Sequence, residues 1–367
     1  MQRSLNDFFW FGFTNQRADL TNKVNTYDLN QFPLINGKQT SLEVAIKELK
    51  SILRDSTVHF DGFSCDYQSQ NSLIELAEKS RSSVNHCEHK EINSFYSAYQ
   101  RYGGSIVSFN EIKKRSDLVI FVGKFDEYIM KRFIEKINWK NTKKNKAIYN
   151  LGNSNPSVIE KNIKRKDINF TVNLLLDLFK DKLNSKKLRS LKEKIISSRY
   201  PVIIINPNNG FIITQKIFRI VDYINKNFKK IRMFRVSGSN NSSGFVNNCV
   251  IKTGFPGSLS FNDWGVSYNP LKYNAENLRN LKNTQIYVSN LNSEPSIVNF
   301  KQNIFIGHPN IKKRKDFRIF IPVKTPGIDS SGLILRSDGV GLFKLEKKID
   351  SNYIELNQLI QELRNYD

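Results

Sequence analysis

Apolar runs and amphipathic segments alternate along most of this chain. The short apolar runs are typical of strands buried on both faces of a sheet, and they occupy residues 58–63, 118–122, 201–206 and 231–236. The segments between them place apolar residues at i, i+3 and i+4, as helices do, and the clearest are 41–53, 71–81, 91–102 and 212–228. Strands that alternate with helices predict an α/β fold with parallel sheets.

The order of these elements predicts two Rossmann-like units, the second inserted into the first. The first unit would comprise residues 41–146 and 271–367, because three more strand patterns, a hairpin and a last helix follow residue 270. The inserted unit would comprise residues 147–270, entered through a basic linker that ends at Lys146. Residues 1–40 would be an extension with an aromatic cluster at Phe8–Phe13. That cluster would pack on this chain's own core or dock on a partner subunit.

Chemistry is expected in two loops of the first unit. In doubly wound domains, ligands bind where the carboxyl ends of the strands meet, and here those ends lead into residues 62–71 and 84–90. The second loop carries residue types that ligate zinc, namely His86, Cys87, Glu88, His89 and Glu91. No second group of ligands at a suitable spacing accompanies them, so the sequence favours a polar loop. Cys65 with His86 would suit nucleophilic catalysis, although a cysteine at a strand end is more often packed.

Composition narrows the class of protein. The chain has 367 residues, 39% of them apolar and 12% aromatic, enough for a globular protein of two domains. We expect a soluble, unexported protein, because no apolar run is long enough to span a membrane or serve as an export signal. Three scattered cysteines cannot form a disulfide framework, which suits the cytoplasm. Glycine-rich phosphate loops and the nucleophile elbow of hydrolases are missing from the sequence.

The net charge of +23, from 57 Lys and Arg against 34 Asp and Glu, allows two interpretations. One is a polyanionic partner, which would meet the basic runs at 140–146, 161–166 and 312–315, although such runs are more often solvated loops. The other is base composition, because an AT-rich genome encodes many Lys, Asn and Ile residues together. Nucleic acid is not expected as the partner, since the sequence contains no recognisable nucleic-acid-binding module.

Three groups of motifs occur in a fixed order. The first is SCDYQ at 64–68 with ELAE at 75–78 and EIKKRSDLVI at 111–120. The second is TGFP at 253–256 with YNP at 268–270, and the third is GID at 327–329 with Gly332, Arg336 and DGV at 338–340. From about residue 37 to the C-terminus, this order resembles the B-type subunit of formylmethanofuran dehydrogenase. It is at least as similar to the corresponding subunit of the bacterial formyltransferase/hydrolase complex.

The resemblance implies a fold like the central domains of molybdopterin oxidoreductases. Redox members of the family hold an iron–sulfur cluster and a molybdenum or tungsten pterin centre through cysteines or selenocysteine. This chain has no cysteine before Cys65 and no CxxC, whereas a cluster needs about four thiolates. Counting back from Asp117 places the family's metal ligand at Glu91, and Cys87 would need a gap. We therefore expect neither cofactor nor metal, and interpret as a lost-site loop the residues Cys65, His86, Cys87, His89 and Glu91.

The resemblance implies a non-redox structural subunit without a catalytic site of its own. Its complex would move a formyl group from formyl-tetrahydromethanopterin to a methanofuran-type carrier and hydrolyse the product to formate. Its partners would be the other subunits, and the basic surface would be available to a polyglutamate tail on the carrier. Neither nucleic acid nor a membrane is expected. The alternative is a degenerate dehydrogenase subunit that retains a pterin–metal redox role.

Overall fold

The computed structural model describes residues 24–366, with gaps at 138–145, 153–158, 160, 165–167, 181, 183–185, 237–238, 280–282, 296, 299 and 301. The described chain divides into two compact units. The first unit comprises residues up to His89 and from Gly238 onward, and the inserted unit comprises Lys90–Ser237. The aromatic cluster at Phe8–Phe13 and most of the predicted linker at 139–146 lie outside the described residues.

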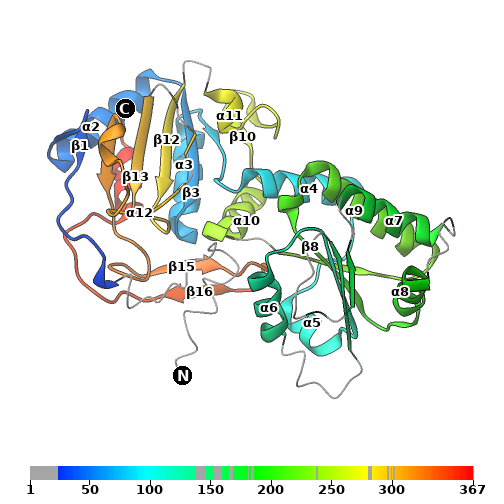
Figure 1. Ribbon diagram of the computed structural model, residues 1–367. Coiled ribbons are helices and arrows are strands. Elements are labelled where there is room, and N and C mark those ends of the chain that lie inside the picture. The colour runs from blue at the N-terminus through cyan, green and yellow to red at the C-terminus, as the bar shows by residue number, and fades with distance from the viewer. Residues whose placement is uncertain are drawn as a thin grey trace. The chain divides into compact units, whose positions relative to one another are not determined.

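The first unit is built on a nine-stranded sheet in the order β11-β10-β4-β3-β12-β13-β14-β1-β2. Its centre is parallel and comprises β4 (Ser83–Val84), β3 (Val58–Ser64), β12 (Thr284–Ser289), β13 (Gln302–Gly307) and β14 (Ile319–Pro322). Antiparallel strands extend both edges, namely β10 (Leu259–Asn262) and β11 (Gly265–Tyr268) on one side and β1 (Leu34–Ile35) and β2 (Lys38–Gln39) on the other. The long central strands stand side by side in Figure 1.

Helices of the first unit pack on one another or on a strand of this sheet. They are α2 (Leu42–Asp55), α3 (Tyr67–Lys79), α10 (Ser242–Thr253), α11 (Ala275–Leu278) and α12 (Leu356–Leu363), and α3 contacts both α10 and α12. The helix α3 starts four residues earlier than its apolar pattern predicts, because Asp66 caps it by accepting the N–H groups of Gln68 and Ser69. The predicted hairpin is present as β15 (Gly332–Leu335) and β16 (Leu342–Leu345).

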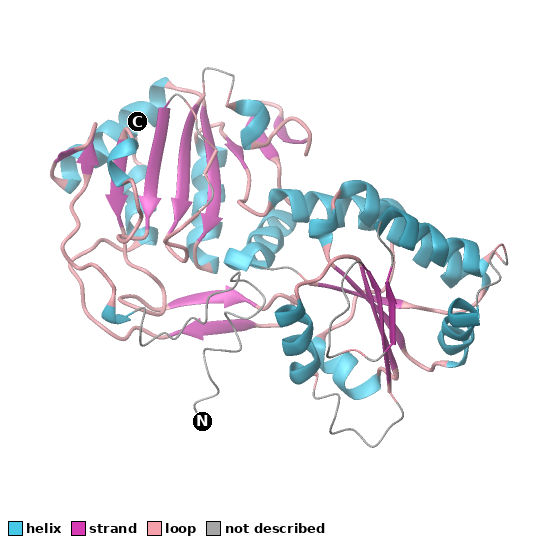
Figure 2. Cartoon of the chain, in the orientation of Figure 1, coloured by secondary structure: helices cyan, strands magenta, loops and turns pink. Residues whose placement is uncertain are grey.

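The inserted unit is a five-stranded sheet, which Figure 2 shows nearly edge-on. Every pairing in this sheet is parallel. Its order is β7 (Lys161–Lys164), β6 (Ala147–Gly152), β5 (Leu118–Val122), β8 (Pro201–Ile205) and β9 (Arg232–Arg235). Its helices are α4 (His89–Tyr102), α5 (Phe109–Arg115), α6 (Glu127–Lys136), α7 (Ile168–Phe179), α8 (Lys186–Ser197) and α9 (Phe211–Asn227). Among the described residues, no helix of either unit is long and apolar enough to cross a membrane.

The insertion is present, but its boundaries differ from those that the sequence predicts. The strand β5 pairs with β6 and β8 instead of completing the first sheet, so the inserted unit begins near residue 90 and not at 147. It also ends earlier, because β10 returns to pair with β4 of the first sheet. An apolar run shows that a strand is buried but carries no information about which sheet buries it.

Candidate functional site

Three segments of the first unit meet at the carboxyl ends of β3 and β4. The backbone N–H of Cys87, in the loop that leaves β4, donates to the carbonyl of Gly62 at 3.1 Å. A helical turn at Ser239–Asn241 completes this edge, because Ser64 Oγ donates to Asn240 Oδ1 at 3.3 Å. We call these segments the carboxyl-edge site, and they comprise residues 62–66, 85–89 and 239–241.

The backbone of the carboxyl-edge site is left-handed at several positions. Gly62 and Phe63 have φ of 87° and 49°, and Asn240 and Asn241 have φ of 51° and 57°. Glycine is required at the first position, because a Cβ there would lie 2.5 Å from the carbonyl oxygen of Val288. A buried phenylalanine at positive φ is strained unless its surroundings hold it. Such strain concentrates at functional sites, which supports placing the candidate site here.

The side chain of His86 is buried and has a partner at each ring nitrogen. Nδ1 accepts the backbone N–H of Glu88 at 3.0 Å, so it carries no proton. Nε2 lies 3.2 Å from the carbonyl oxygen of Asn240 and donates its proton there. Burial, partly against the ring of Phe245 at 5.2 Å, lowers the pKa of His86 to about 4. The ring is therefore neutral near pH 7 and holds the loop to the helical turn.

The carboxylate of Glu88 makes a second connection between the same two segments. Its Oε1 accepts hydrogen bonds from Ser239 Oγ and, at 3.2 Å, from Asn240 Nδ2. A third connection runs from the turn to β3, because Asn241 Nδ2 donates to the carbonyl of Cys65 at 2.9 Å. The polar groups named here, which face one another across this edge, are thus hydrogen-bonded to one another.

The three cysteines are thiols in different surroundings. Cys65 and Cys249 are fully buried, and burial raises the pKa of both thiols. Cys87 is half-buried, its Sγ lies 3.6 Å from His86 Nδ1, and it packs against an apolar cluster that contains Tyr287. Cys65 and Cys87 therefore lie in the same site, where Cys65 is an inaccessible thiol.

The other two predicted site residues lie in different units. His89 Nε2 is 3.1 Å from Glu276 Oε2, at the start of α11 in the first unit. Glu91 falls in the inserted unit, where it is buried in the first turn of α4. A carboxylate is favoured there by the positive end of the helix dipole. The carboxyl-edge site thus contains four of the five predicted residues, and Glu91 lies outside it in α4.

The carboxyl-edge site does not fit the pterin–metal centre that the motif resemblance implies. A soft metal requires a thiolate ligand, but burial keeps the thiol of Cys65 protonated. The position to which the family's ligand aligns is a buried carboxylate, Glu91. In the part of the chain that the structure describes, no three His, Cys, Asp or Glu side chains converge to hold a metal ion. An iron–sulfur cluster needs about four thiolates, more than this sequence contains.

A layer of buried polar residues adjoins the site, and the sequence interpretation did not predict it. His59 and Asp61 alternate with apolar residues on β3, and their register partners on β12 are Gln285 and Tyr287. Asp61 Oδ2 accepts the amide N–H of Gln285 at 3.0 Å, and His59 Nδ1 lies 2.8 Å from Ser83 Oγ. Polar residues at alternate positions of two apolar strands are the signal that could have revealed this layer.

Burial shifts the two titratable groups of this polar layer in opposite directions. It raises the pKa of Asp61 to about 6 and lowers the pKa of His59 to about 3. Among the described residues, neither His59 Nε2 nor Gln285 Oε1 has a hydrogen-bond partner. Each unpaired buried atom costs about 1–3 kcal/mol, so the layer destabilises the unit and is a second candidate for a functional role.

Comparisons with known proteins identify the fold. No family model matches the sequence, and no curated protein matches it. The fold is similar to a chain of the formyltransferase/hydrolase complex (FhcABCD) from Methylorubrum extorquens, solved in complex with methylofuran, with a TM-score of 0.78, 15% identity, and coverage of 91% of this chain and 98% of that chain. It is also similar to acetylene hydratase from Pelobacter acetylenicus, with a TM-score of 0.53, 10% identity, and coverage of 94% of this chain and 62% of that chain.

These likenesses confirm the predicted fold class, an α/β protein of two Rossmann-like units with a molybdopterin-oxidoreductase-like fold. They also agree, at the level of the fold, with the motif resemblance to the B-type subunit of formyltransferase/hydrolase complexes.

Proposed function

We propose that this chain is a non-redox structural subunit of a formyltransferase/hydrolase complex. The observation that carries the proposal is a fold likeness that extends over nearly the whole of both chains, 91% of this one and 98% of the other. Subunit interfaces are spread over large surfaces, so a structural role requires the whole fold and not one pocket. The order of the three motif groups, from SCDYQ to DGV, supports the same assignment.

The chemistry of the carboxyl-edge site supports the non-redox part of this proposal. Catalysis at a pterin–metal centre would need an accessible thiolate, but the pKa of Cys65 is raised and its side chain is buried. His86 and Glu88 direct their hydrogen bonds to the turn at Ser239–Asn241. In the proposed role, this loop is a structural remnant of a lost site that holds β3, β4 and the turn together.

In this proposal the formyl group moves from formyl-tetrahydromethanopterin to a methanofuran-type carrier, and the product is hydrolysed to formate. Other subunits carry that chemistry, and this chain positions them as part of one-carbon metabolism in the cytoplasm of a methylotroph. The support is that the similar complex was solved with methylofuran. A polyglutamate tail on the carrier would find a basic surface on this chain, whose net charge is +23.

Purification of the tagged full-length chain from its own cells tests this function. We expect the other subunits to co-purify, and the complex to transfer formyl groups and release formate without stoichiometric molybdenum, tungsten or iron. A matched preparation that carries Cys65→Ser and Cys87→Ser should contain the same subunits and the same activity. Stoichiometric metal that disappears in this double variant would instead establish the alternative, a degenerate dehydrogenase subunit with a redox role. Recovery of the chain alone, without activity, would overturn both.

A further inference from the structure

The positive charge of the chain is concentrated in the inserted unit. Lys90–Ser237 holds 32 Lys and Arg residues against 12 Asp and Glu, a net charge of +20. The first unit holds the remaining 25 against 22, a net charge of +3. A charge of this size destabilises a compact unit by self-repulsion. The concentration of positive charge in the inserted unit therefore requires an explanation.

Base composition does not explain this asymmetry. An AT-rich genome raises the frequency of Asn together with that of Lys, and Asn is equally frequent in the two units. It occupies 17 of the 148 residues of the inserted unit and 26 of the 219 residues of the first unit. The excess of positive charge is therefore a property of the inserted unit and not of the gene as a whole.

The topology of the inserted sheet gathers many of these charges at one edge. Because every strand pair is parallel, the residues that precede each strand lie at the same amino-terminal edge. We call this the amino-edge surface, and its basic residues are Lys113, Lys114, Arg115, Lys146, Lys194, Arg199, Lys229, Lys230 and Arg232. Ligands of doubly wound sheets bind at the opposite edge, so this surface is separate from the usual ligand position.

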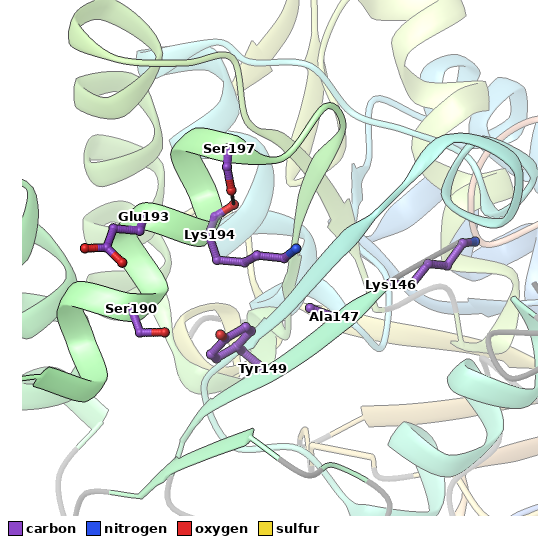
Figure 3. Close-up of a pocket in the computed structure, with 7 residues that line it drawn as sticks. All are labelled: Lys146, Ala147, Tyr149, Ser190, Glu193, Lys194 and Ser197. Atoms are coloured by element: carbon purple, nitrogen blue, oxygen red, sulfur yellow. Dashed lines mark hydrogen bonds between the residues drawn. The ribbon is translucent and has the colours of Figure 1, made fainter. Parts of the chain in front are cut away.

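A recess lies on the amino-edge surface. Its volume is about 410 Å³, and its lining residues are Lys146, Ala147, Tyr149, Ser190, Glu193, Lys194 and Ser197. Figure 3 shows these side chains around the start of β6 and the end of α8. Figure 3 shows Lys194 reaching from α8 toward β6, whereas Lys146 extends away from α8. The recess is large enough for a side chain, and its polar lining also includes Ser190, Ser197 and Glu193.

Some of these cations also serve the fold, as basic residues at helix C-termini commonly do. Lys146 Nζ donates to the carbonyl of Lys113 at 2.9 Å, and Lys229 Nζ donates to the carbonyl of Ile196 at 3.0 Å. The nearby carboxylate of Asp117 is engaged by the backbone N–H groups of Arg199 and Tyr200. Such contacts engage three of the nine cations, because Arg232 Nη1 also donates to the carbonyl of Lys230 at 3.5 Å. Five others, at positions 113, 114, 115, 199 and 230, are exposed.

We propose that the amino-edge surface is a docking site for an acidic polypeptide segment. Charge complementarity selects an anionic partner, and the exposed cations on this surface outnumber Glu193, the acidic residue in the lining of the recess. Single-stranded nucleic acid binds on exposed aromatic platforms, but the edge aromatics Tyr149 and Tyr200 are buried. The guanidinium of Arg232 also covers the ring of Tyr200 at 3.6 Å. This inference rests on the inserted unit alone and does not depend on the proposed function.

Two matched triple variants of the full chain test the proposal. The edge variant carries Lys114→Ser, Arg199→Ser and Lys230→Ser, one exposed cation ahead of each of β5, β8 and β9. The control variant removes three exposed cations elsewhere in the same unit, with Lys124→Ser, Lys131→Ser and Arg219→Ser. Fluorescence anisotropy would follow the binding of a labelled peptide of alternating Glu and Ser, and of oligouridine with the same net charge. Circular dichroism would verify that both variants are folded.

We expect the edge variant to raise the Kd for the acidic peptide about tenfold and the control variant to raise it less than about threefold. The Kd of the unmodified chain should also rise between about 0.1 M and about 1 M salt, as the Debye length shortens. Equal weakening in both variants would show that the charge acts without a defined surface. Tighter binding of oligouridine, with the same dependence on the edge residues, would identify a nucleic-acid surface instead. Absence of peptide binding at low salt would overturn the proposal.

Discussion

Asp61 and Gln285 form a hydrogen bond at 3.0 Å between β3 and β12, where both side chains are buried. The Oε1 atom of the same glutamine has no hydrogen-bond partner among the described residues. The amide N–H that Gln285 donates, like the backbone N–H of Gly62 at 2.7 Å, favours the ionised carboxylate. Burial outweighs both bonds and raises the pKa of Asp61 to about 6.

The first prediction concerns the pH dependence that this carboxyl group imposes on stability. In the unfolded chain, an aspartate ionises near pH 3.9, so between about pH 4 and about pH 6 the folded state binds more protons than the unfolded state. The free energy of unfolding should therefore fall by on the order of 3 kcal/mol as the pH rises through this window. Asp61→Asn should remove that loss, because an amide stays neutral and still pairs with Gln285. Urea unfolding of both proteins across the window would measure the difference, and parallel curves would contradict it.

The second prediction concerns His86, whose pKa shift has the opposite sign. Its folded-state pKa of about 4 lies below the unfolded value near 6.5, so its stabilising contribution is present above pH 6.5 and is lost as the pH falls toward 4. His86→Ala should flatten this part of the pH profile. It should also cost about 1–3 kcal/mol at pH 7, because the Glu88 N–H and the Asn240 carbonyl lose their partner.

His86→Asn is the matched control for this experiment, because its side-chain oxygen can still accept the N–H of Glu88. It should lose less stability than the alanine variant at pH 7 while showing the same flattened profile. An alanine variant as stable as the unmodified protein would show that the ring does not hold the loop.

The third prediction concerns the reactivity of the thiols. Cys87 is half-buried, whereas Cys65 and Cys249 are fully buried and have raised pKa values. Thiolates are the reactive form of cysteine, so a chromogenic disulfide reagent should modify Cys87 first in the native protein. The other two should react only on unfolding. Peptide mapping of the first modified thiol would contradict this order if it identified Cys65.

The fourth prediction concerns the lost-site loop and rests on the proposed function. Cys87→Ala and Glu91→Ala should each leave formyl transfer and formate release nearly unchanged in the assembled complex. A residue that transfers a proton in the reaction contributes about 100-fold or more to the rate. A loss of that size, with all subunits still present by gel filtration, would show that the loop is a working site.

The fifth prediction concerns the segment before the described residues. Within the described chain, Tyr27 packs against Ile328 and Tyr353, and its hydroxyl donates to Asp329 at 2.9 Å. Deletion of Met1–Phe13 stops well before this contact, so the α/β core should remain folded. We expect the deletion to release partner subunits, because an aromatic cluster is typical of an interface centre. Calorimetry that shows the truncated chain unfolded would assign the cluster to this chain's own core instead.

The sequence by itself determined the kinds of element and part of the chemistry. The apolar runs at 118–122 and 201–206 became β5 and β8, as expected of strands buried on both faces. The run at 58–63 became β3, although His59 and Asp61 interrupt its apolar sequence. The count and spacing of the cysteines were enough to predict that no iron–sulfur cluster with four thiolate ligands is bound. The positions of the strands and the prediction about the cluster both depend only on local composition, which can be read from the sequence.

Only the tertiary structure decided which residues share a site. The sheet to which β5 belongs and the pairing of Asp61 with Tyr287 across two strands depend on contacts between segments far apart in the chain. The left-handed turn at Asn240 and Asn241 is held by partners from β3 and from the loop after β4. The amino-edge surface exists because parallel pairing brings the starts of several strands to one edge of the sheet. The order of charges along the sequence does not show which strand starts become neighbours. Long-range pairing is a property of the whole fold, so no local signal in the sequence was able to reveal it.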